Sequence, residues 1–280
     1  MELIQIDLHK ILRSRIRGWK GKLIPGFLIS GLERLIRQEE LNRILRECYP
    51  AEGSAFAREV YNCLGLTIEV SGIENIPAGK RLLFASNHPL GGLDGIGLIK
   101  VLGDIYTDSQ IRFMVNDMLM NVAPLRNVFL PINKYGSQAR SAARAVNEAF
   151  AGEMQMVVFP AGLVSRLHDN GEIHDLQWQK SFVAKAIEYK RDIVPVRFIG
   201  LNRPRFYKLA RLRKKLGIKV NLEQATLPAE LCAARDRHYK VIFGKPISWE
   251  SLGASQKPLA ELAAGIRSEV YRLNPDSADR

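Results

Sequence analysis

A histidine and an aspartate, His88 and Asp94, lie six residues apart in residues 86–95, which read Ser-Asn-His-Pro-Leu-Gly-Gly-Leu-Asp-Gly. A histidine whose ring is oriented by a carboxylate can accept a proton from a hydroxyl or an amine near neutral pH. Gly91 and Gly92 allow the loop between the histidine and the aspartate to turn sharply and to approach a ligand closely. The spacing therefore indicates a general-base site. The alternative is a structural histidine, with Asp94 as the N-cap of a helix.

A second segment that could do chemistry is residues 156–166, with the sequence Met-Val-Val-Phe-Pro-Ala-Gly-Leu-Val-Ser-Arg. An apolar stretch typical of a strand runs into a loop of proline and glycine, which ends on a hydroxyl and a guanidinium. A serine nucleophile, Ser86 or Ser165, would make the chain a hydrolase. Neither serine lies in a Gly-x-Ser-x-Gly elbow, so this alternative is the weaker one.

The elements that would position these segments alternate between strands and helices. Apolar runs predict strands at 66–71, 81–86, 111–115, 128–132, 155–160, 193–199 and 239–243, and apolar spacing near 3.6 predicts helices at 93–103, 137–151, 178–190 and 258–273. This alternation favours an α/β fold, with a mixed, largely parallel sheet flanked by helices. Residues 1–64 are basic and have an amphipathic helical pattern, so we expect an N-terminal helical segment that can associate with a membrane, followed by an α/β domain over 65–280.

The chain is strongly basic, with 41 Lys and Arg against 29 Asp and Glu, and a formal net charge of +12. This balance implies a polyanionic partner. Eight of the seventeen residues 203–219 are Lys or Arg, with hydrophobic residues between them. This segment could contact lipid headgroups, an acidic acyl carrier protein or nucleic acid, or it could be only a solvated helix face. The chain has no recognisable nucleic-acid reader motif, so no nucleic-acid partner is expected.

Other features bear on the compartment and on metal binding. Three widely spaced cysteines (Cys48, Cys63 and Cys232) suit a reducing compartment. No apolar run approaches the length of a membrane span, and no signal-peptide pattern is present, so we expect a soluble or peripheral protein.

His168 and His174 lie among carboxylates, which is compatible with a metal site, but the Asn-Gly between them favours a hairpin turn. We therefore predict no metal.

The motifs, taken in order, resemble those of the lysophospholipid acyltransferase family, whose best-known member acylates 1-acylglycerol-3-phosphate. Asn87-His88 and Asp94 resemble the first block of that family. Phe159-Pro160-Ala161-Gly162, followed by Ser165-Arg166, resembles the third block, and the Val-Pro-Val of residues 194–196 resembles the fourth. The resemblance covers about residues 65 to 200.

The departures from the family pattern concern the acceptor. Five residues, not four, separate His88 from Asp94; Ala161 replaces a glutamate; Leu163-Val164 replaces Thr-Arg; and Lys134 lies near the place of the middle-block arginine. In the family that glutamate and arginine are associated with binding the acceptor and its phosphate, which argues against lysophosphatidic acid. The Gly-Gly loop followed by Phe-Pro-Ala-Gly looks like the branch labelled haemolysins, which includes acyltransferases of ornithine and glycine lipids.

The resemblance implies an O-acyltransferase that moves a fatty acyl group from acyl carrier protein or CoA to a lyso-lipid, such as a lyso-ornithine lipid, a lyso-glycine lipid or a lysophospholipid. It requires no cofactor beyond the thioester donor. It implies His88 as general base oriented by Asp94, loop N–H groups near Gly162 as oxyanion donors, and substrate contacts from Asn87, Gly91, Gly92, Lys134, Phe159, Pro160, Gly162, Ser165 and Arg166. The expected location is peripheral, on an anionic membrane surface at the cytoplasmic face of the inner membrane. A non-catalytic, haemolysin-like membrane-perturbing protein is the alternative.

Overall fold

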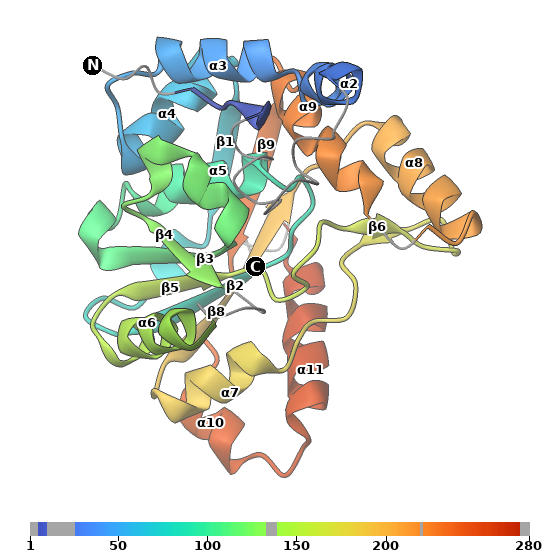
Figure 1. Cartoon of the computed structure of the whole chain (residues 1–280). Coiled ribbons are helices and arrows are strands. Elements are labelled where there is room, and N and C mark those ends of the chain that lie inside the picture. Colours follow the sequence, from blue (N-terminus) through green and yellow to red (C-terminus); the bar gives the residue numbers. More distant parts are fainter. Residues whose placement is uncertain (1–4, 10–25, 133–138, 219–220, 275–280) are drawn as a thin grey trace.

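The computed structural model describes residues 5–9, 26–132, 139–218 and 221–274. Its strands are β1 (Thr67–Ser71), β2 (Leu82–Ser86), β3 (Ile111–Asn116), β4 (Phe129–Ile132), β5 (Gln155–Val158), β6 (Arg166–Leu167), β7 (Ile173–His174), β8 (Asp192–Ile199) and β9 (His238–Phe243). Seven of them form one sheet in the order β1-β9-β8-β2-β5-β3-β4 (Figure 1). All neighbouring strands in it are parallel except β8 and β9. The predicted mixed, largely parallel sheet is confirmed.

Five adjacent strands (β8, β2, β5, β3 and β4) run in the same direction, so their carboxyl ends share one edge of the sheet. The chain leaves β2 towards β3 on one side, and leaves β5 towards β8 on the other. Ligands of open α/β sheets bind where connections diverge in this way, outside the carboxyl ends of the strands. His88 follows β2 and Phe159 follows β5, so the two motif segments meet at this point.

Helices cover both faces of the sheet (Figure 1). The helices are α2 (Gly26–Ile36), α3 (Gln38–Glu47), α4 (Gly53–Cys63), α5 (Leu93–Leu102), α6 (Ala139–Ala151), α7 (Ser181–Glu188), α8 (Pro204–Lys215), α9 (Leu227–Cys232), α10 (Trp249–Ala254) and α11 (Leu259–Arg272). Short 3₁₀ turns lie at Ile73–Asn75, Asp108–Gln110, Asp117–Asn121, Ala123–Leu125 and Leu222–Thr226 (η6). One face of the sheet packs with α4 and α5, and the other packs with α6, α7, α10 and α11.

Side chains that alternate along each strand fill the cores on the two faces of the sheet in turn. Phe84 of β2 and Val194 of β8 point into the core under α4 and α5, whereas Leu83 and Ile193, one residue away, point into the core on the other face. Strands covered on both sides read as continuous apolar runs, which is why the sequence pattern located them. All seven predicted strands of the sheet are found, with ends within two residues of the prediction.

The four predicted helices are also found, as α5, α6, α7 and α11. Residues 137–138 of the predicted helix 137–151 lie outside the described residues. Helix α7 begins at Ser181 rather than at residue 178, because the indole N–H of Trp178 is held by Asp175 ahead of the helix. The short helices α9 and α10, whose patterns are weak, were not predicted.

The N-terminal region is helical where it is described, as expected, in α2, α3 and α4. Residues 1–4 and 10–25 of the predicted helical segment lie outside the described residues. The expected boundary at residue 64 falls between α4 and β1, yet α4 packs in the same core as α5. The Tyr61 hydroxyl of α4 donates a hydrogen bond to the carbonyl of Leu93 at 2.9 Å, at the start of α5. This contact braces the segment that carries Asp94.

Arg191, at the entrance to β8, is fully buried. Its guanidinium donates five hydrogen bonds to backbone carbonyls, those of Leu82, Ala149, Phe150, Gly152 and Met154. Burial lowers the pKa of Arg191 to about 10, so the group stays charged at neutral pH. The side chain thus ties the turn between α6 and β5 to the start of β2.

Residues 166–174 form a small hairpin in which β6 and β7 pair antiparallel. The amide of His168 donates to the carbonyl of Glu172 at 2.8 Å, which closes the turn around the Asn-Gly pair. The rings of His168 and His174 stack with centroids 3.5 Å apart. The hairpin prediction is confirmed, and within the described ranges no group of three His, Cys, Asp or Glu side chains is arranged to hold a metal. None of the described helices is both long and apolar enough to cross a membrane.

Candidate active site

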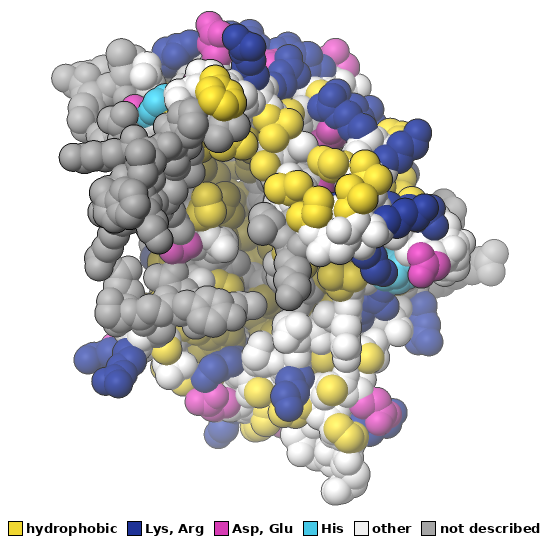
Figure 2. All heavy atoms as spheres, turned by 45° about the vertical axis from the view of Figure 1, so that its right-hand side comes forward, with side chains coloured by type: hydrophobic (Ala, Val, Ile, Leu, Met, Phe, Trp, Pro, Cys, Tyr) yellow, Lys and Arg dark blue, Asp and Glu magenta, His cyan; other side chains and the backbone are white. Residues whose placement is uncertain are grey.

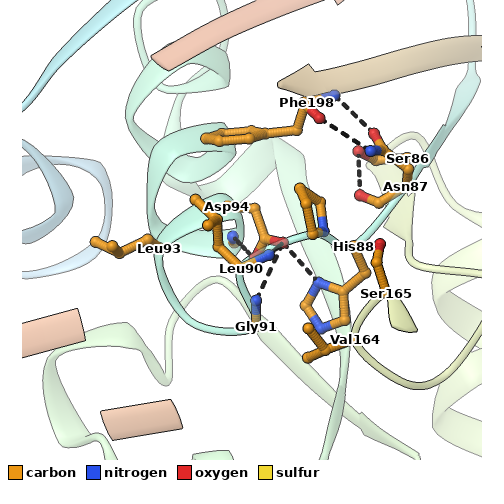
Figure 3. A network of polar contacts seen from close by, with 12 residues as sticks. Ser86, Asn87, His88, Leu90, Gly91, Leu93, Asp94, Val164, Ser165 and Phe198 are labelled. Carbon is orange, nitrogen blue, oxygen red and sulfur yellow. Dashed lines mark hydrogen bonds and ion pairs between the residues drawn. The ribbon is translucent and has the colours of Figure 1, made fainter. Parts of the chain in front are cut away.

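His88 and Asp94 contact each other directly at the carboxyl end of β2 (Figure 3). Nδ1 of His88 lies 3.0 Å from Oδ2 of Asp94. Asp94 is fully buried, whereas His88 keeps part of its surface exposed. The pairing predicted from the sequence is therefore present, with the buried carboxylate behind the ring and the ring nearer to solvent.

The carboxylate of Asp94 is saturated with donors. Its Oδ2 also accepts the backbone N–H groups of Leu90 at 2.8 Å and Gly91 at 3.2 Å, and its Oδ1 accepts that of Gly95 at 2.8 Å. Helix α5 has Gly92 as its N-cap, so Asp94 lies in the first turn and is not the cap. A carboxylate with this environment can only accept from His88, so Nδ1 carries a proton, and in the neutral form of the ring Nε2 keeps its lone pair. That tautomer is the one a general base requires.

Electrostatics favour the charged forms of both groups. Burial alone would lower the pKa of His88, but the charge of Asp94 and its hydrogen bond raise that pKa above its ordinary value. Burial alone would raise the pKa of Asp94, but His88 and the two loop N–H groups lower it. The pair therefore stabilises an imidazolium, the species that forms when a histidine acts as a general base.

The segment after β5 packs against the ring of His88. The ring of Phe159 stacks on His88 with centroids 4.2 Å apart, and the backbone N–H of Ser165 donates to the carbonyl of His88 at 2.8 Å. Gly162 has a φ of +64°, which suits glycine, and its own N–H donates to the carbonyl of Phe159 at 2.9 Å. The N–H of Gly162 itself is thus used by an internal turn, and the prediction that N–H groups of this loop serve an oxyanion concerns its other amides. The carbonyl of Pro160 accepts from Gln179, so this residue also helps to fix the loop.

Both candidate serine nucleophiles donate their hydrogen bonds elsewhere. The hydroxyl of Ser86 donates to the carbonyl of Asn87 at 2.9 Å, and that of Ser165 donates to Oδ1 of Asp175 at 2.6 Å. Both serines are buried. Neither forms the serine–histidine contact that activates a nucleophile, so the geometry argues against the hydrolase alternative.

Asp175 is a residue of the site that sequence reasoning did not single out. Its fully buried carboxylate accepts the backbone N–H of His88 at 3.2 Å, the hydroxyl of Ser165 and the indole N–H of Trp178 at 2.9 Å. Its backbone N–H donates to the hydroxyl of Tyr271. Asp175 thus joins the loop after β2, the loop after β5 and α11. The local sequence does not mark this role, since His88 and Tyr271 are 87 and 96 residues away along the chain.

Asn87 spans the gap between β2 and β8. Its Oδ1 accepts the N–H of Phe198 at 2.7 Å, and its Nδ2 donates to the carbonyl of the same residue at 2.9 Å. The side chain therefore continues the hydrogen-bond ladder for one step after the backbone has left the sheet. It fixes the point from which His88 projects.

Gly91 has a φ of +87°, and a Cβ there would lie 2.8 Å from the side chain of Leu227 and 3.0 Å from that of Val164. The turn therefore requires glycine for its conformation and for space. Gly92, with a φ of −96°, is the N-cap of α5. The extra residue in this loop relative to the family pattern is accommodated by this close approach.

Arg166, expected to bind acceptor charge, is buried and forms an ion pair with Glu223 at 2.9 Å. The same glutamate accepts from Arg213 of α8 at 2.8 Å. Two guanidinium groups thus share one carboxylate, which leaves an excess positive charge beside the site. Lys134, the other expected cation, lies outside the described residues.

With the fold and the geometry of the site described, the chain can be compared with known proteins. The chain matches the acyltransferase family over residues 16–279. This chain belongs to the acyltransferase family. It is 42% identical over 271 residues to a lyso-glycine lipid O-acyltransferase of Bacteroides thetaiotaomicron, covering 97% of this chain and 98% of that protein. It is 41% identical over 268 residues to a lyso-glycine lipid O-acyltransferase of Phocaeicola vulgatus, covering 96% and 95%.

Among solved structures, this acyltransferase is similar to the 1-acyl-sn-glycerophosphate (LPA) acyltransferase PlsC from Thermotoga maritima. The two share 13% sequence identity with a TM-score of 0.48, over 95% of this chain and 88% of that one. The resemblance stated from the motifs is confirmed by the family match and by the two relatives, and the family favours a catalytic protein over the non-catalytic alternative.

Proposed function

We propose that this acyltransferase transfers a fatty acyl group from an acyl-carrier-protein or acyl-CoA thioester to the hydroxyl of a lyso-glycine lipid. The observation that carries the proposal is the His88–Asp94 pair at 3.0 Å, whose geometry leaves Nε2 free of the Asp94 hydrogen bond. Two relatives with more than 40% identity over nearly the whole chain carry the name lyso-glycine lipid O-acyltransferase, which supports this acceptor over lyso-ornithine lipid or lysophosphatidic acid.

In the proposed mechanism, Nε2 of His88 removes the proton of the acceptor hydroxyl while the oxygen attacks the thioester carbonyl. The new C–O bond gives a tetrahedral oxyanion, and collapse of this intermediate breaks the C–S bond. The imidazolium then returns its proton to the departing thiolate, so that thiol and ester are released. Asp94 holds the ring in position and stabilises the imidazolium in both steps. Asp175 and Phe159 restrict the movement of the loop and the ring.

The headgroup of a glycine lipid carries a carboxylate, whereas that of lysophosphatidic acid carries a phosphate. The excess positive charge of Arg166 and Arg213 around Glu223 supports binding of one such anion near the site. Pro160, Gly162 and Ser165 hold the loop that carries Arg166, and so take part in this binding indirectly. The free thiols of all three cysteines suit the cytoplasmic face of the inner membrane, where we place the reaction.

The test is acyl transfer from labelled acyl-carrier protein, and separately from acyl-CoA, to lyso-glycine lipid, lyso-ornithine lipid and lysophosphatidic acid. We expect an esterified product with lyso-glycine lipid, lost in His88→Ala and retained in His9→Ala, a change at a histidine that no motif includes. Product from lysophosphatidic acid alone would overturn the acceptor. Full activity of His88→Ala would overturn the mechanism.

A further inference from the structure

The outer face of α8 and the neighbouring end of α2 expose large hydrophobic side chains. Phe27 is 74% exposed, Leu216 is 65% exposed and Leu212 is 54% exposed. Leu212 and Leu216 are one helical turn apart, so they lie on the same side of α8. Leu35 of α2 and Leu222 of η6 are also exposed, and η6 contacts both α2 and α8. These side chains form one surface, which we name the α2/α8 surface.

Basic residues accompany the hydrophobic side chains of this surface. Figure 2 shows hydrophobic side chains gathered on this face, with Lys and Arg around them. Several arginines of the segment have carboxylate partners: Arg203 and Arg205 pair with Glu230, and Arg213 pairs with Glu223. By contrast, within the described part of the chain, no acidic side chain forms an ion pair with the exposed lysines of α8, which are Lys208, Lys214 and Lys215.

The inner side of the same helix packs on the active-site loops. Phe206 and Tyr207 of α8 are buried against Val164, which lies beside His88 in Figure 3. Leu227, which follows η6, packs in the same cluster and faces Gly91 of the catalytic loop. Only α8 and the side chains on its inner face therefore lie between a partner bound to its outer face and the loops that carry Val164 and Gly91.

We propose that the α2/α8 surface docks on an anionic lipid bilayer and inserts its leucines and Phe27 into the interface, so that the active site faces the layer holding the acceptor. The choice of a bilayer rests on the proposed function, in which the acceptor is a lipid. It also rests on the composition of the surface, because interfacial helices combine inserted Leu and Phe with flanking lysines that reach the headgroups. Unpaired lysines add attraction to anionic lipid. This assigns the described part of the basic segment, residues 203–218, together with α2, to the membrane rather than to acyl carrier protein.

The test measures sedimentation of the full chain with vesicles of phosphatidylcholine, alone or mixed with phosphatidylglycerol. We expect binding to the mixed vesicles that weakens as salt is added. The double variant Leu212→Ser/Leu216→Ser should bind more weakly by about tenfold or more, since both side chains would otherwise leave water. The variant Lys208→Gln/Lys214→Gln/Lys215→Gln should lose the preference for phosphatidylglycerol.

The matched control is Ile73→Ser, which removes a hydrophobic side chain that is 44% exposed at the end of β1. Strand β1 runs opposite to β2, so Ile73 lies at the edge of the sheet away from His88. We expect this variant to bind vesicles like the native chain. Circular dichroism verifies that all variants are folded.

The outcomes separate this proposal from the proposed function. The variant His88→Ala should bind vesicles normally, so failure of acyl transfer would leave the docking result intact. Vesicle binding by the double-leucine variant equal to that of the native chain would overturn the proposal. Loss of acyl-carrier-protein binding in the triple-lysine variant, with vesicle binding unchanged, would assign the surface to the carrier and would also overturn it.

Discussion

Replacing Asp94 by asparagine keeps the size of the side chain and removes the charge that faces His88. At about 4 Å between the charge centres and an effective dielectric constant near 20, the attraction between carboxylate and imidazolium is about 4 kcal/mol. Since roughly 1.36 kcal/mol corresponds to a tenfold change in rate, the loss of most of this attraction in the transition state predicts a fall in kcat of about 10²–10³. The amide also cannot accept all four hydrogen bonds that Asp94 receives.

The same change predicts a distinct pH dependence. Because Asp94 raises the pKa of His88, its removal lowers that pKa, and burial of the ring lowers it further. A general base must be neutral, so the rate falls on the acid side of its pKa. We therefore expect the acid limb of kcat to move to lower pH in Asp94→Asn, although the plateau is lower.

The assay is the initial rate of acyl transfer to lyso-glycine lipid over the pH range in which histidine titrates. Asp104→Asn is the control, because Asp104 is an exposed carboxylate just after α5 that pairs with Arg58. A plateau rate for Asp94→Asn within about threefold of the native rate would refute the charge argument, since that ratio is well under 1 kcal/mol. An acid limb that stays in place would refute the assignment of that limb to His88.

Three further outcomes are expected. Asp175→Asn removes a second negative charge near His88, so the acid limb should move in the same direction by a smaller amount in the same assay. Gly91→Ala brings a Cβ against Leu227 at a φ of +87°, so thermal unfolding should show a loss of about 1–3 kcal/mol together with reduced activity. Arg191→Met leaves five buried or partly buried carbonyls without this donor, and denaturant unfolding should show a loss of at least about 3 kcal/mol with the pH profile unchanged.

The sequence predicted those parts of the fold whose pattern is set by burial on both sides. Strands β2 and β8 are continuous apolar runs, and the amphipathic spacing of α5 and α11 is regular, so their positions followed from periodicity. Helices α9 and α10 have six residues each, too few for a pattern to stand out. The start of α7 was placed too early because the backbone N–H of Gln179 donates to the carbonyl of Pro160, a contact between separate segments of the chain that has no local signal.

The same distinction holds for the candidate site. His88 and Asp94 could be paired from the sequence because one short loop joins them. The partners of Arg166 and Asp175 could not, since Glu223 and Tyr271 follow them at separations of 57 and 96 residues. From the sequence, Arg166 was therefore interpreted as a cation free to bind substrate. In the structure it already forms an ion pair with Glu223 of η6.

The side-chain amide of Asn87 takes the place of a peptide group of β2 in pairing with Phe198 of β8. The opening of the active-site loop can therefore be measured at Phe198 without a substrate. The amide hydrogen of Phe198 is held by this side chain and not by a backbone carbonyl of β2. Its exchange with solvent therefore follows the opening of the segment that carries His88, independently of the fraying of the strands themselves. Isotope exchange at this one position would measure how tightly the loop is closed in the resting enzyme, on a membrane, or in any variant that is too slow to assay.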